Sequence, residues 1–267
     1  MVQGIDVSHW QDDKSTAQKI DFSKAVQKGA KFVFIKVSER GAIDKDFEYN
    51  WQAAKAAGLL RGGYPFLRWD LSGLLQARIF SELLAEDPGE LPPVADFEAP
   101  RLGSLYPSNA LLEQFLVEVE TKTGRKPILY TSPGYWDIHG RNKTTKLFDS
   151  KWAYYKLWVA HYFTTYQAGV SKPKELEPWK SAGKTWTFWQ YTQNGDGLAY
   201  GAESKSIDLN WFNGDLDALK KFASSGQTSG SSGTSTTTTT SALTSAQVAS
   251  LKTKVNTAID DWKKNLK

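Results

Sequence analysis

The sequence predicts an α/β fold, an irregular (β/α) barrel of about eight strands, over residues 1–223. Two observations predict it: short β-branched or aromatic runs recur eight times in this region, and helix-like segments separate the first six of them. Alternation of strand and helix implies parallel strands joined by right-handed crossovers. Eight such strands can close into a barrel, so one large domain accounts for most of the chain.

The predicted elements follow one another in a regular order until the last third of the domain. The eight strand-like runs are 2–6, 31–37, 60–66, 92–98, 127–132, 157–162, 185–191 and 206–210, and the clearer helical segments are 22–29, 46–58, 72–86 and 108–124. Residues 163–184 contain proline, glycine and lysine without a convincing helical pattern. We therefore expect the final strands to be joined by loops or hairpins.

Composition excludes several classes of protein. The chain has 267 residues and no cysteine, so disulfides and thiolate metal sites cannot exist. His9, His139 and His161 show no metal-ligand spacing, and we expect neither a metal nor another cofactor. No apolar run approaches the roughly 18 residues that a membrane span needs, so membrane insertion is not expected.

A tether and a separate tail follow the domain. Residues 224–242 are a linker of serine, threonine and glycine with almost nothing apolar to bury. Residues 243–267 predict a helix with one apolar stripe, in which Val248, Val255 and Trp262 repeat every seven residues. A lone helix of this length is marginal in water, so it should dock on copies of itself, on the domain or on the cell wall. The heptad spacing favours a homo-oligomer.

The positive charge belongs mainly to this tail. Residues 243–267 hold five lysines against Asp260 and Asp261, a net charge of +3 out of +4 for the whole chain. The first 223 residues therefore carry about +1, and the domain lacks the large positive charge that indicates a nucleic-acid partner.

Four carboxylates are the main functional signal. Asp6 ends the first run, Asp96 and Glu98 end the fourth, and Asp208 lies in the eighth. In barrels of this kind the active site is built at the C-terminal ends of the strands, so we expect the four to converge on one mouth. Asp96 and Glu98 are two apart on a strand and should share a face.

Glycosidic cleavage fits this pattern best. Apolar neighbours and a second negative charge both raise a carboxyl pKa. An acid that stays protonated near neutrality, beside an ionised carboxylate, is what glycoside hydrolysis needs. A divalent cation and a set of ordinary surface acids are the alternatives. Neither a serine-hydrolase elbow nor a phosphate-binding loop is present.

Aromatic residues support a sugar ligand, because flat rings suit the apolar faces of pyranoses. Trp158 and Trp186 are expected in the core instead. The expected substrate-binding residues, at or near the strand ends, are Trp10, Tyr64, Trp69, Tyr130, Tyr162, Trp189 and Gln190.

The motifs GIDVSHWQ, KFVFIKVSERG, PPVADFE, KPILYTSPGYW, LWVAHY, WTFWQYT and SIDLNWFNG resemble those of glycoside hydrolase family 25. The resemblance covers about residues 2–222 and implies an irregular β/α barrel without a cofactor. It implies hydrolysis of the β-1,4 bond between N-acetylmuramic acid and N-acetylglucosamine in bacterial peptidoglycan. It also implies that Glu98 is the general acid. Asp6, Asp96 and Asp208 would then position the substrate acetamido group and stabilise positive charge.

The sequence departs from the family's usual pattern at two strand ends. Tyr64, Pro65 and Phe66 stand where Tyr-His-Phe is usual, and Lys36 to Gly41 read KVSERG instead of something like KATEG. Neither departure touches the four acids, but both alter the expected substrate contacts.

The start of the chain lacks a signal-peptide pattern, which suits a phage endolysin held in the host cytoplasm until a holin opens the membrane. A virion-attached lysin is the other setting considered. A non-catalytic wall-binding barrel and a chitin-directed glycosidase are the alternative functions.

Overall fold

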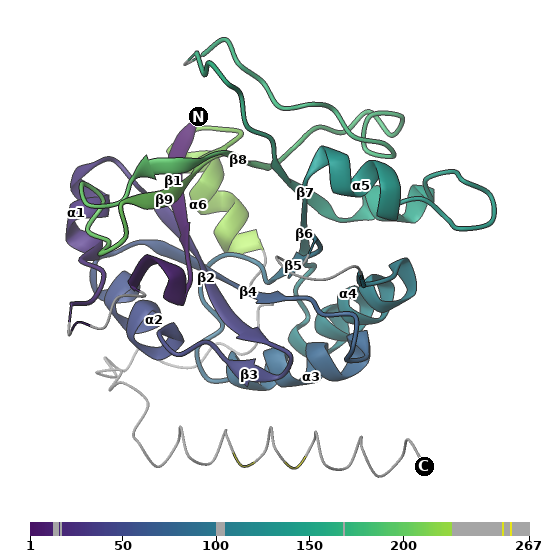
Figure 1. Cartoon of the computed structure of the whole chain (residues 1–267), viewed down its shortest axis with the longest axis horizontal. Coiled ribbons are helices and arrows are strands. Elements are labelled where there is room, and N and C mark those ends of the chain that lie inside the picture. The colour runs from purple at the N-terminus through teal and green to yellow at the C-terminus, as the bar shows by residue number, and fades with distance from the viewer. Residues whose placement is uncertain are drawn as a thin grey trace.

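Eight strands close into a barrel in the computed structural model, which describes residues 1–12, 16, 18–99, 105–167, 169–225, 253 and 257. Figure 1 shows the strands at the centre of the molecule with helices around them. The barrel strands are β1 (Val2–Val7), β2 (Phe32–Glu39), β4 (Leu60–Phe66), β5 (Val94–Asp96), β6 (Ile128–Thr131), β7 (Lys156–Ala160), β8 (Phe188–Asp196) and β9 (Ser206–Phe212). Pairing of β1 with β2 closes the ring, and β3 (Ala42–Ile43) adds a short antiparallel strand to β2.

Strand direction distinguishes β9 from the rest. It runs antiparallel to both β1 and β8, whereas the other neighbours in the barrel are parallel. The predicted barrel and all eight predicted strand runs are therefore confirmed, as is the hairpin between the last strands. Within the described part of 163–184 no helix forms, because this segment only bridges β7 and β8.

Helices surround the strands, and their ends follow ordinary capping chemistry. The four predicted helices are observed as α1 (Phe22–Gln27), α2 (Phe47–Ala56), α3 (Gly73–Leu83) and α4 (Asn109–Thr123). The side chains of Ser72 and Ser108 accept hydrogen bonds from the third amides of α3 and α4. Gly124 ends α4 with φ of +65°, a conformation that favours glycine.

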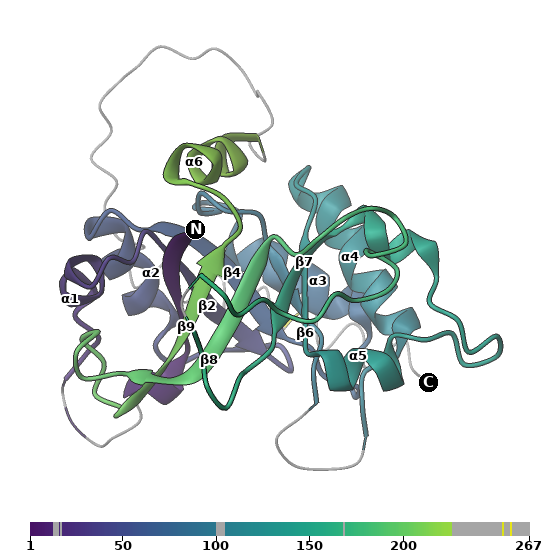
Figure 2. The ribbon, with the colours of Figure 1, turned by 90° about the horizontal axis from the view of Figure 1, so that it is seen from above.

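Two further helices and two 3-10 turns were not predicted. The 3-10 turns are η1 (His9–Asp12) and η2 (Ser150–Tyr154), and the helices are α5 (Pro133–His139) and α6 (Leu216–Ser225). Figure 2 shows α6 at one end of the barrel and α5 at the other. Because α6 ends at Ser225, it extends two residues into the predicted linker. The rest of the linker, and the predicted C-terminal helix apart from residues 253 and 257, lie outside the described residues.

The core forms two layers because side chains alternate along each strand. Phe32, Phe34, Trp158, Phe188 and Phe212 point into the barrel and fill it with aromatic rings. Residues of opposite parity pack between the strands and the helices. Every helix in the described part is too short or too polar to cross a lipid bilayer.

Glycine makes room for the rings inside the barrel. A Cβ atom at Gly4 would lie 2.5 Å from the ring of Phe32, and one at Gly62 would lie 2.5 Å from the ring of Phe34. The aromatic interior therefore depends on a missing side chain in each neighbouring strand. Leu219 and Ala223 of α6 pack against this interior at the end of the barrel where the parallel strands begin.

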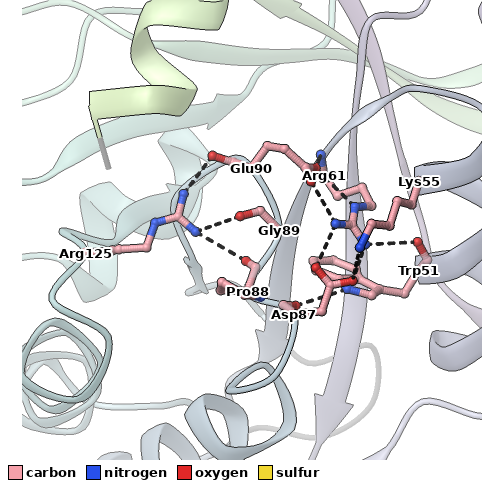
Figure 3. A network of polar contacts seen from close by, with 8 residues as sticks. All are labelled: Trp51, Lys55, Arg61, Asp87, Pro88, Gly89, Glu90 and Arg125. Carbon is pink, nitrogen blue, oxygen red and sulfur yellow. Dashed lines mark hydrogen bonds and ion pairs between the residues drawn. The ribbon is translucent and has the colours of Figure 1, made fainter. Parts of the chain in front are cut away.

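A buried arginine fastens the loop before β5 at the same end of the barrel (Figure 3). The side chain of Arg61 is 1% exposed, and its Nη1 and Nη2 atoms lie 2.9 Å from the carboxylate oxygens of Asp87. Its Nη2 atom also donates to Glu90 Oε1 at 2.7 Å, and its guanidinium stacks 4.7 Å from the ring centre of Trp51. Arg125 donates to the carbonyl oxygens of Pro88, Gly89 and Glu90.

Replacing Arg61 with alanine should destabilise the fold by about 3 kcal/mol, because two acids would lose their buried partner. The estimate is at the lower end for a buried pair, since the side chains of Asp87 and Glu90 are 25% and 32% exposed. Urea unfolding measures the change. Arg78→Ala is the matched control: its pair with Glu118 is on the surface and should be worth at most about 1 kcal/mol. Equal losses in the two variants would contradict this account.

Candidate active site

The four predicted acids gather at one mouth of the barrel. Asp6 is the penultimate residue of β1, Asp96 ends β5, and Glu98 follows two residues later. Asp208 is directly opposite Asp6 in the β1–β9 register. Asp208 lies near the start of β9, which is antiparallel to both of its neighbours. Because an antiparallel strand begins where its parallel neighbours end, the third residue of β9 lies at the same rim as the last residues of the parallel strands.

Alternation along the strands turns these acids inward. Asp6, Lys36, Tyr64, Asp96 and Tyr130 have the parity of the interior aromatic rings and form a polar layer above them. Asp6 and Asp96 are each 5% exposed, whereas Glu98 and Asp208 are half-buried at the rim. The two outer acids can therefore meet a ligand while the two inner ones stay largely out of water.

Two amides hold the carboxylate of Asp6. Gln190 Nε2 donates to Asp6 Oδ2 at 2.8 Å, and Asn210 Nδ2 donates to the same oxygen at 2.7 Å. Each amide is itself oriented by an aromatic donor. Tyr130 and Tyr162 donate their hydroxyls to Gln190 Oε1, and Trp158 Nε1 donates to Asn210 Oδ1 at 2.8 Å. These donors fix which end of each amide faces Asp6.

Asp6 and Asp208 form an acid–carboxylate pair. Burial raises the pKa of Asp6 to about 6, although the hydrogen bonds from Gln190, Asn210 and Asp208 oppose the rise. Burial and the adjacent charge of Asp6 raise the pKa of Asp208 well above its usual range. Asp208 is therefore the partner that keeps its proton, and it donates that proton to the carboxylate of Asp6.

Glu98 has the properties of an acid that is protonated near neutrality. Burial, together with the charge of Asp6, raises the pKa of Glu98 to about 7, while Lys36 opposes the rise. Burial and the charge of Glu98 likewise raise the pKa of Asp96 well above its usual range. The Oδ1 atom of Asp96 is buried and has no hydrogen-bond partner among the described residues. The hydrogen-bonding capacity of that oxygen is thus unused within the described part of the chain.

A buried lysine balances part of this negative charge. Lys36 is 5% exposed, and its Nζ atom forms an ion pair with Glu39 Oε2 at 2.6 Å. Arg68 approaches the other oxygen of Glu39 at 3.5 Å. This pairing keeps one cation below the rim and ties the end of β2 to the segment after β4.

The predicted sugar-binding aromatics divide into three groups. Trp10, Trp69 and Tyr162 follow the ends of β1, β4 and β7, and each is more than 40% exposed, so their rings are accessible to a ligand. Tyr64 and Tyr130 face inward and are buried, where they serve as hydrogen-bond donors to Val7 O and Gln190.

Trp189 does not line the mouth, and its prediction as a substrate-binding residue is wrong. Its side chain is fully buried in the layer between strands and helices, and its Nε1 atom donates to the carbonyl of His161. Neighbouring residues on a strand face opposite sides, so Gln190 could face the mouth only if Trp189 faced away. Trp158 is in the core as predicted, and Trp186 packs against the core while half-buried.

Sequence reasoning missed two residues of the site. Asn210 was not singled out, although it is two residues after Asp208 and therefore shares its face. Tyr135 on α5 was also missed: it is 7% exposed, and its hydroxyl has no hydrogen-bond partner among the described residues. Burial and the charges of Asp96 and Glu98 raise its pKa, which indicates that it lies beside these acids.

The mouth has the chemistry of a proton donor beside stabilising carboxylates rather than that of a metal centre. No group of three or more acids or histidines in the described ranges has a geometry that could hold a metal ion. A half-buried acid with a pKa of about 7, close to an acid–carboxylate pair, can protonate a leaving oxygen and stabilise a cationic centre.

Comparison with known proteins agrees with this geometry. Residues 5–198 match the family model described as glycosyl hydrolases family 25. Lysozyme M1 of Streptomyces globisporus is 33% identical over 236 residues, covering 84% of this chain and 72% of its own. An N,O-diacetylmuramidase of Arthroderma benhamiae is 31% identical over 243 residues, covering 84% and 88%.

Solved structures show the same relationship. The bacterial lysozyme from Streptomyces coelicolor superposes with a TM-score of 0.65 at 30% identity, covering 85% of this chain and 98% of its own. The catalytic domain of an endolysin from a Listeria monocytogenes bacteriophage, at 21% identity and a TM-score of 0.58, covers 84% and 97% and shares the fold. The chain belongs to glycosyl hydrolases family 25 and is a glycoside hydrolase.

Proposed function

We propose that the protein is an N-acetylmuramidase that cleaves the β-1,4 bond between N-acetylmuramic acid and N-acetylglucosamine in bacterial peptidoglycan. The observation that carries the proposal is the raised pKa of Glu98, about 7, at a rim shared with three further carboxyl groups. Relatives at 31–33% identity that are named as a lysozyme and an N,O-diacetylmuramidase support this choice of substrate.

Glu98 begins the reaction as the general acid. It gives its proton to the glycosidic oxygen, and the bond from that oxygen to C1 of the muramic acid breaks with its electron pair on the leaving sugar. The positive charge that develops at C1 and the ring oxygen is stabilised by the carboxylate of Asp6. Water then supplies a hydroxyl group to C1, and the remaining proton of that water goes to Glu98, which is thereby restored as an acid.

The other acids position the substrate. Asp208 holds its proton toward Asp6, so Asp6 can be ionised while its neighbour stays neutral. Asp96 has a buried oxygen without a partner among the described residues, and it can meet the acetamido group only if that group enters the mouth below the rim. The exposed rings of Trp10, Trp69 and Tyr162 provide flat surfaces for the sugar faces.

For its biological setting we propose lysis of a bacterial host by a phage, with the enzyme held in the host cytoplasm until a holin opens the membrane; a virion-attached lysin is the other setting. A fold shared with a phage endolysin supports this setting, although the relatives named above come from a bacterium and a fungus. Cells that express the chain together with a holin should lyse, and cells that express it alone should keep growing. Lysis without a holin would contradict cytoplasmic retention.

Glu98→Gln should lower the rate of wall cleavage by about 10²–10⁴-fold, because glutamine cannot donate the proton. Release of new reducing ends from purified peptidoglycan measures the rate, and muramic acid should form those ends with the unchanged enzyme. The variant should also be more stable at pH 8, since the folded state would no longer bury a group that is charged at that pH. Glu48→Gln, on the exposed surface of α2, is the matched control and should leave the rate unchanged.

Two results would contradict this assignment. Retention of full activity by Glu98→Gln would remove Glu98 from the acid role. New ends formed by N-acetylglucosamine, or faster cleavage of chitin than of peptidoglycan, would replace the muramidase with a chitin-directed glycosidase.

The pH profile of kcat/KM should be bell-shaped, with an acidic limb near 6 and a basic limb near 7. The acidic limb reflects ionisation of Asp6, and the basic limb reflects loss of the Glu98 proton. These groups are coupled, so each limb belongs to the acid cluster as a whole. In Asp6→Asn the basic limb of the residual activity should move to a lower pH, because removing the Asp6 charge lowers the pKa of Glu98. A basic limb that moves upward would contradict the proposed field of Asp6.

A further inference from the structure

A second cavity, of about 510 Å³, lies at the end of the barrel opposite the acidic mouth. Its walls come from η2, the start of β7, the segment before β8, the end of β9 and one face of α6. Figure 2 shows α6 extending from this end of the barrel. The cavity has the volume of an ordinary small-molecule site, and none of the residues assigned to the mouth lines it.

The walls combine aromatic rings with hydrogen-bonding groups. Trp186 and Phe222 line the cavity and are half-buried, so part of each ring remains open. Thr185, Thr187 and Asn213 add hydroxyl and amide groups to the lining, and Asn213 Nδ2 donates to the carbonyl oxygen of Trp186 at 3.0 Å. An open ring beside neutral hydrogen-bonding groups suits the two faces of a sugar, one apolar and the other rich in hydroxyls.

The charged residues of the lining are all lysines. Lys156, Lys184 and Lys221 line the cavity, and no aspartate or glutamate does. Lys184 Nζ donates to the carbonyl of Ala153 at 2.6 Å, whereas Lys156 and Lys221 are exposed and make no ion pair within the described part of the chain. Two of the three cations are thus free to meet an anion.

Neighbouring acids are occupied elsewhere. Glu120 accepts a hydrogen bond from the hydroxyl of Tyr154, and the Nζ atom of Lys126 lies 3.4 Å from the ring centre of Tyr154. Asp215 accepts from the amide of Ala218 as part of the first turn of α6. Neither acid lines the cavity, whose own lining carries three lysines and no carboxylate.

We propose that this cavity is a second saccharide site, which binds a sugar that carries an acidic group from the bacterial cell wall. The sugar ring would lie on Trp186 and Phe222, and the acidic group would meet Lys156 and Lys221 as point charges. A muramic acid carboxylate and a phosphate of a wall polymer share this chemistry. The proposal goes beyond the cleavage reaction and does not need Glu98.

The chain's own tail fits the cavity less well than such a ligand. Residues 226–267 begin directly after Ser225, which lines the cavity, so the tail is near enough to compete. Its predicted helical part, 243–267, carries a net charge of +3 and would bring lysines against lysines. Charge complementarity therefore favours an anionic saccharide.

A site at this end would keep the enzyme on its polymer. The mouth and the cavity open at opposite ends of the barrel, so they can hold different strands of the wall at the same time. Binding at the cavity would raise the effective concentration of substrate at the mouth without changing the chemistry there.

Calorimetric titration of the full chain tests the site, in the Glu98→Gln background so that the ligand is not cleaved. Three probes are used: a muramic-acid-containing wall oligosaccharide, N-acetylglucosamine 6-phosphate and neutral chitotetraose. Lys156→Glu with Lys221→Glu should weaken binding of at least one anionic probe by fivefold or more. Lys220→Glu reverses one charge on α6 outside the cavity lining, half the change of the double variant, and should have less than a twofold effect. The Trp186 indole N–H signal, assigned with Trp186→Phe, should shift when that probe binds.

The two anionic probes identify whether a carboxylate or a phosphate is preferred. The proposal is overturned if neither binds, if Lys220→Glu weakens binding as much as the cavity variant, or if the Trp186 signal does not move. Equal binding of chitotetraose, unaffected by the lysine changes, would also overturn it. N-acetylglucosamine 6-phosphate contains no bond between sugars, so its result stands even if Glu98 proves not to be the catalytic acid.

Discussion

Burial of carboxyl groups at the barrel mouth is the constraint on which the chemistry depends. A carboxylate loses hydration when it is taken out of water, so the neutral form gains relative to the charged form. At this mouth burial and neighbouring charges raise the pKa of Asp96 and Asp208 well above the usual range, and that of Glu98 to about 7. Asp6 keeps the lower value of about 6 because two amides donate to its oxygen. The barrel mouth thus provides both a proton donor, Glu98, and a carboxylate anion, Asp6.

The rest of the fold supports an arrangement that is unfavourable by itself. Between about pH 4 and 7 the folded site binds more protons than the unfolded chain, so the acids lower stability as the pH rises through this range. The aromatic interior below the polar layer and the Arg61 network at the far end offset this loss. The hydrogen bonds through Gln190 and Asn210 then hold the acids in place. The residues that stabilise the fold thus lie in the interior and at the far end of the barrel, whereas the residues that carry the chemistry lie at its mouth.

Much of this architecture could be predicted from the sequence, and the failures have physical reasons. Asp6, Asp96 and Glu98 were placed correctly because parallel strands bring their C-terminal ends to one rim. The final strands were expected to be joined by loops or hairpins, and the hairpin that forms makes β9 antiparallel, so Asp208 meets the other acids from the start of its strand. Trp189 was misplaced because ring chemistry was weighed without strand parity. Tyr135 could not be found in this way, since its helix is only seven residues long and its ring meets Phe97, between the two acids, only through the fold.

The most direct test of the account is an NMR titration of the Glu98 carboxyl carbon in the unliganded enzyme, with the signal assigned by its absence in Glu98→Gln. The account predicts a midpoint near pH 7, and a lower midpoint in Asp6→Asn because one source of the raised pKa is the charge of Asp6. A midpoint near 4.5, the ordinary value for a glutamate in water, would contradict the claim that burial at this rim keeps Glu98 protonated.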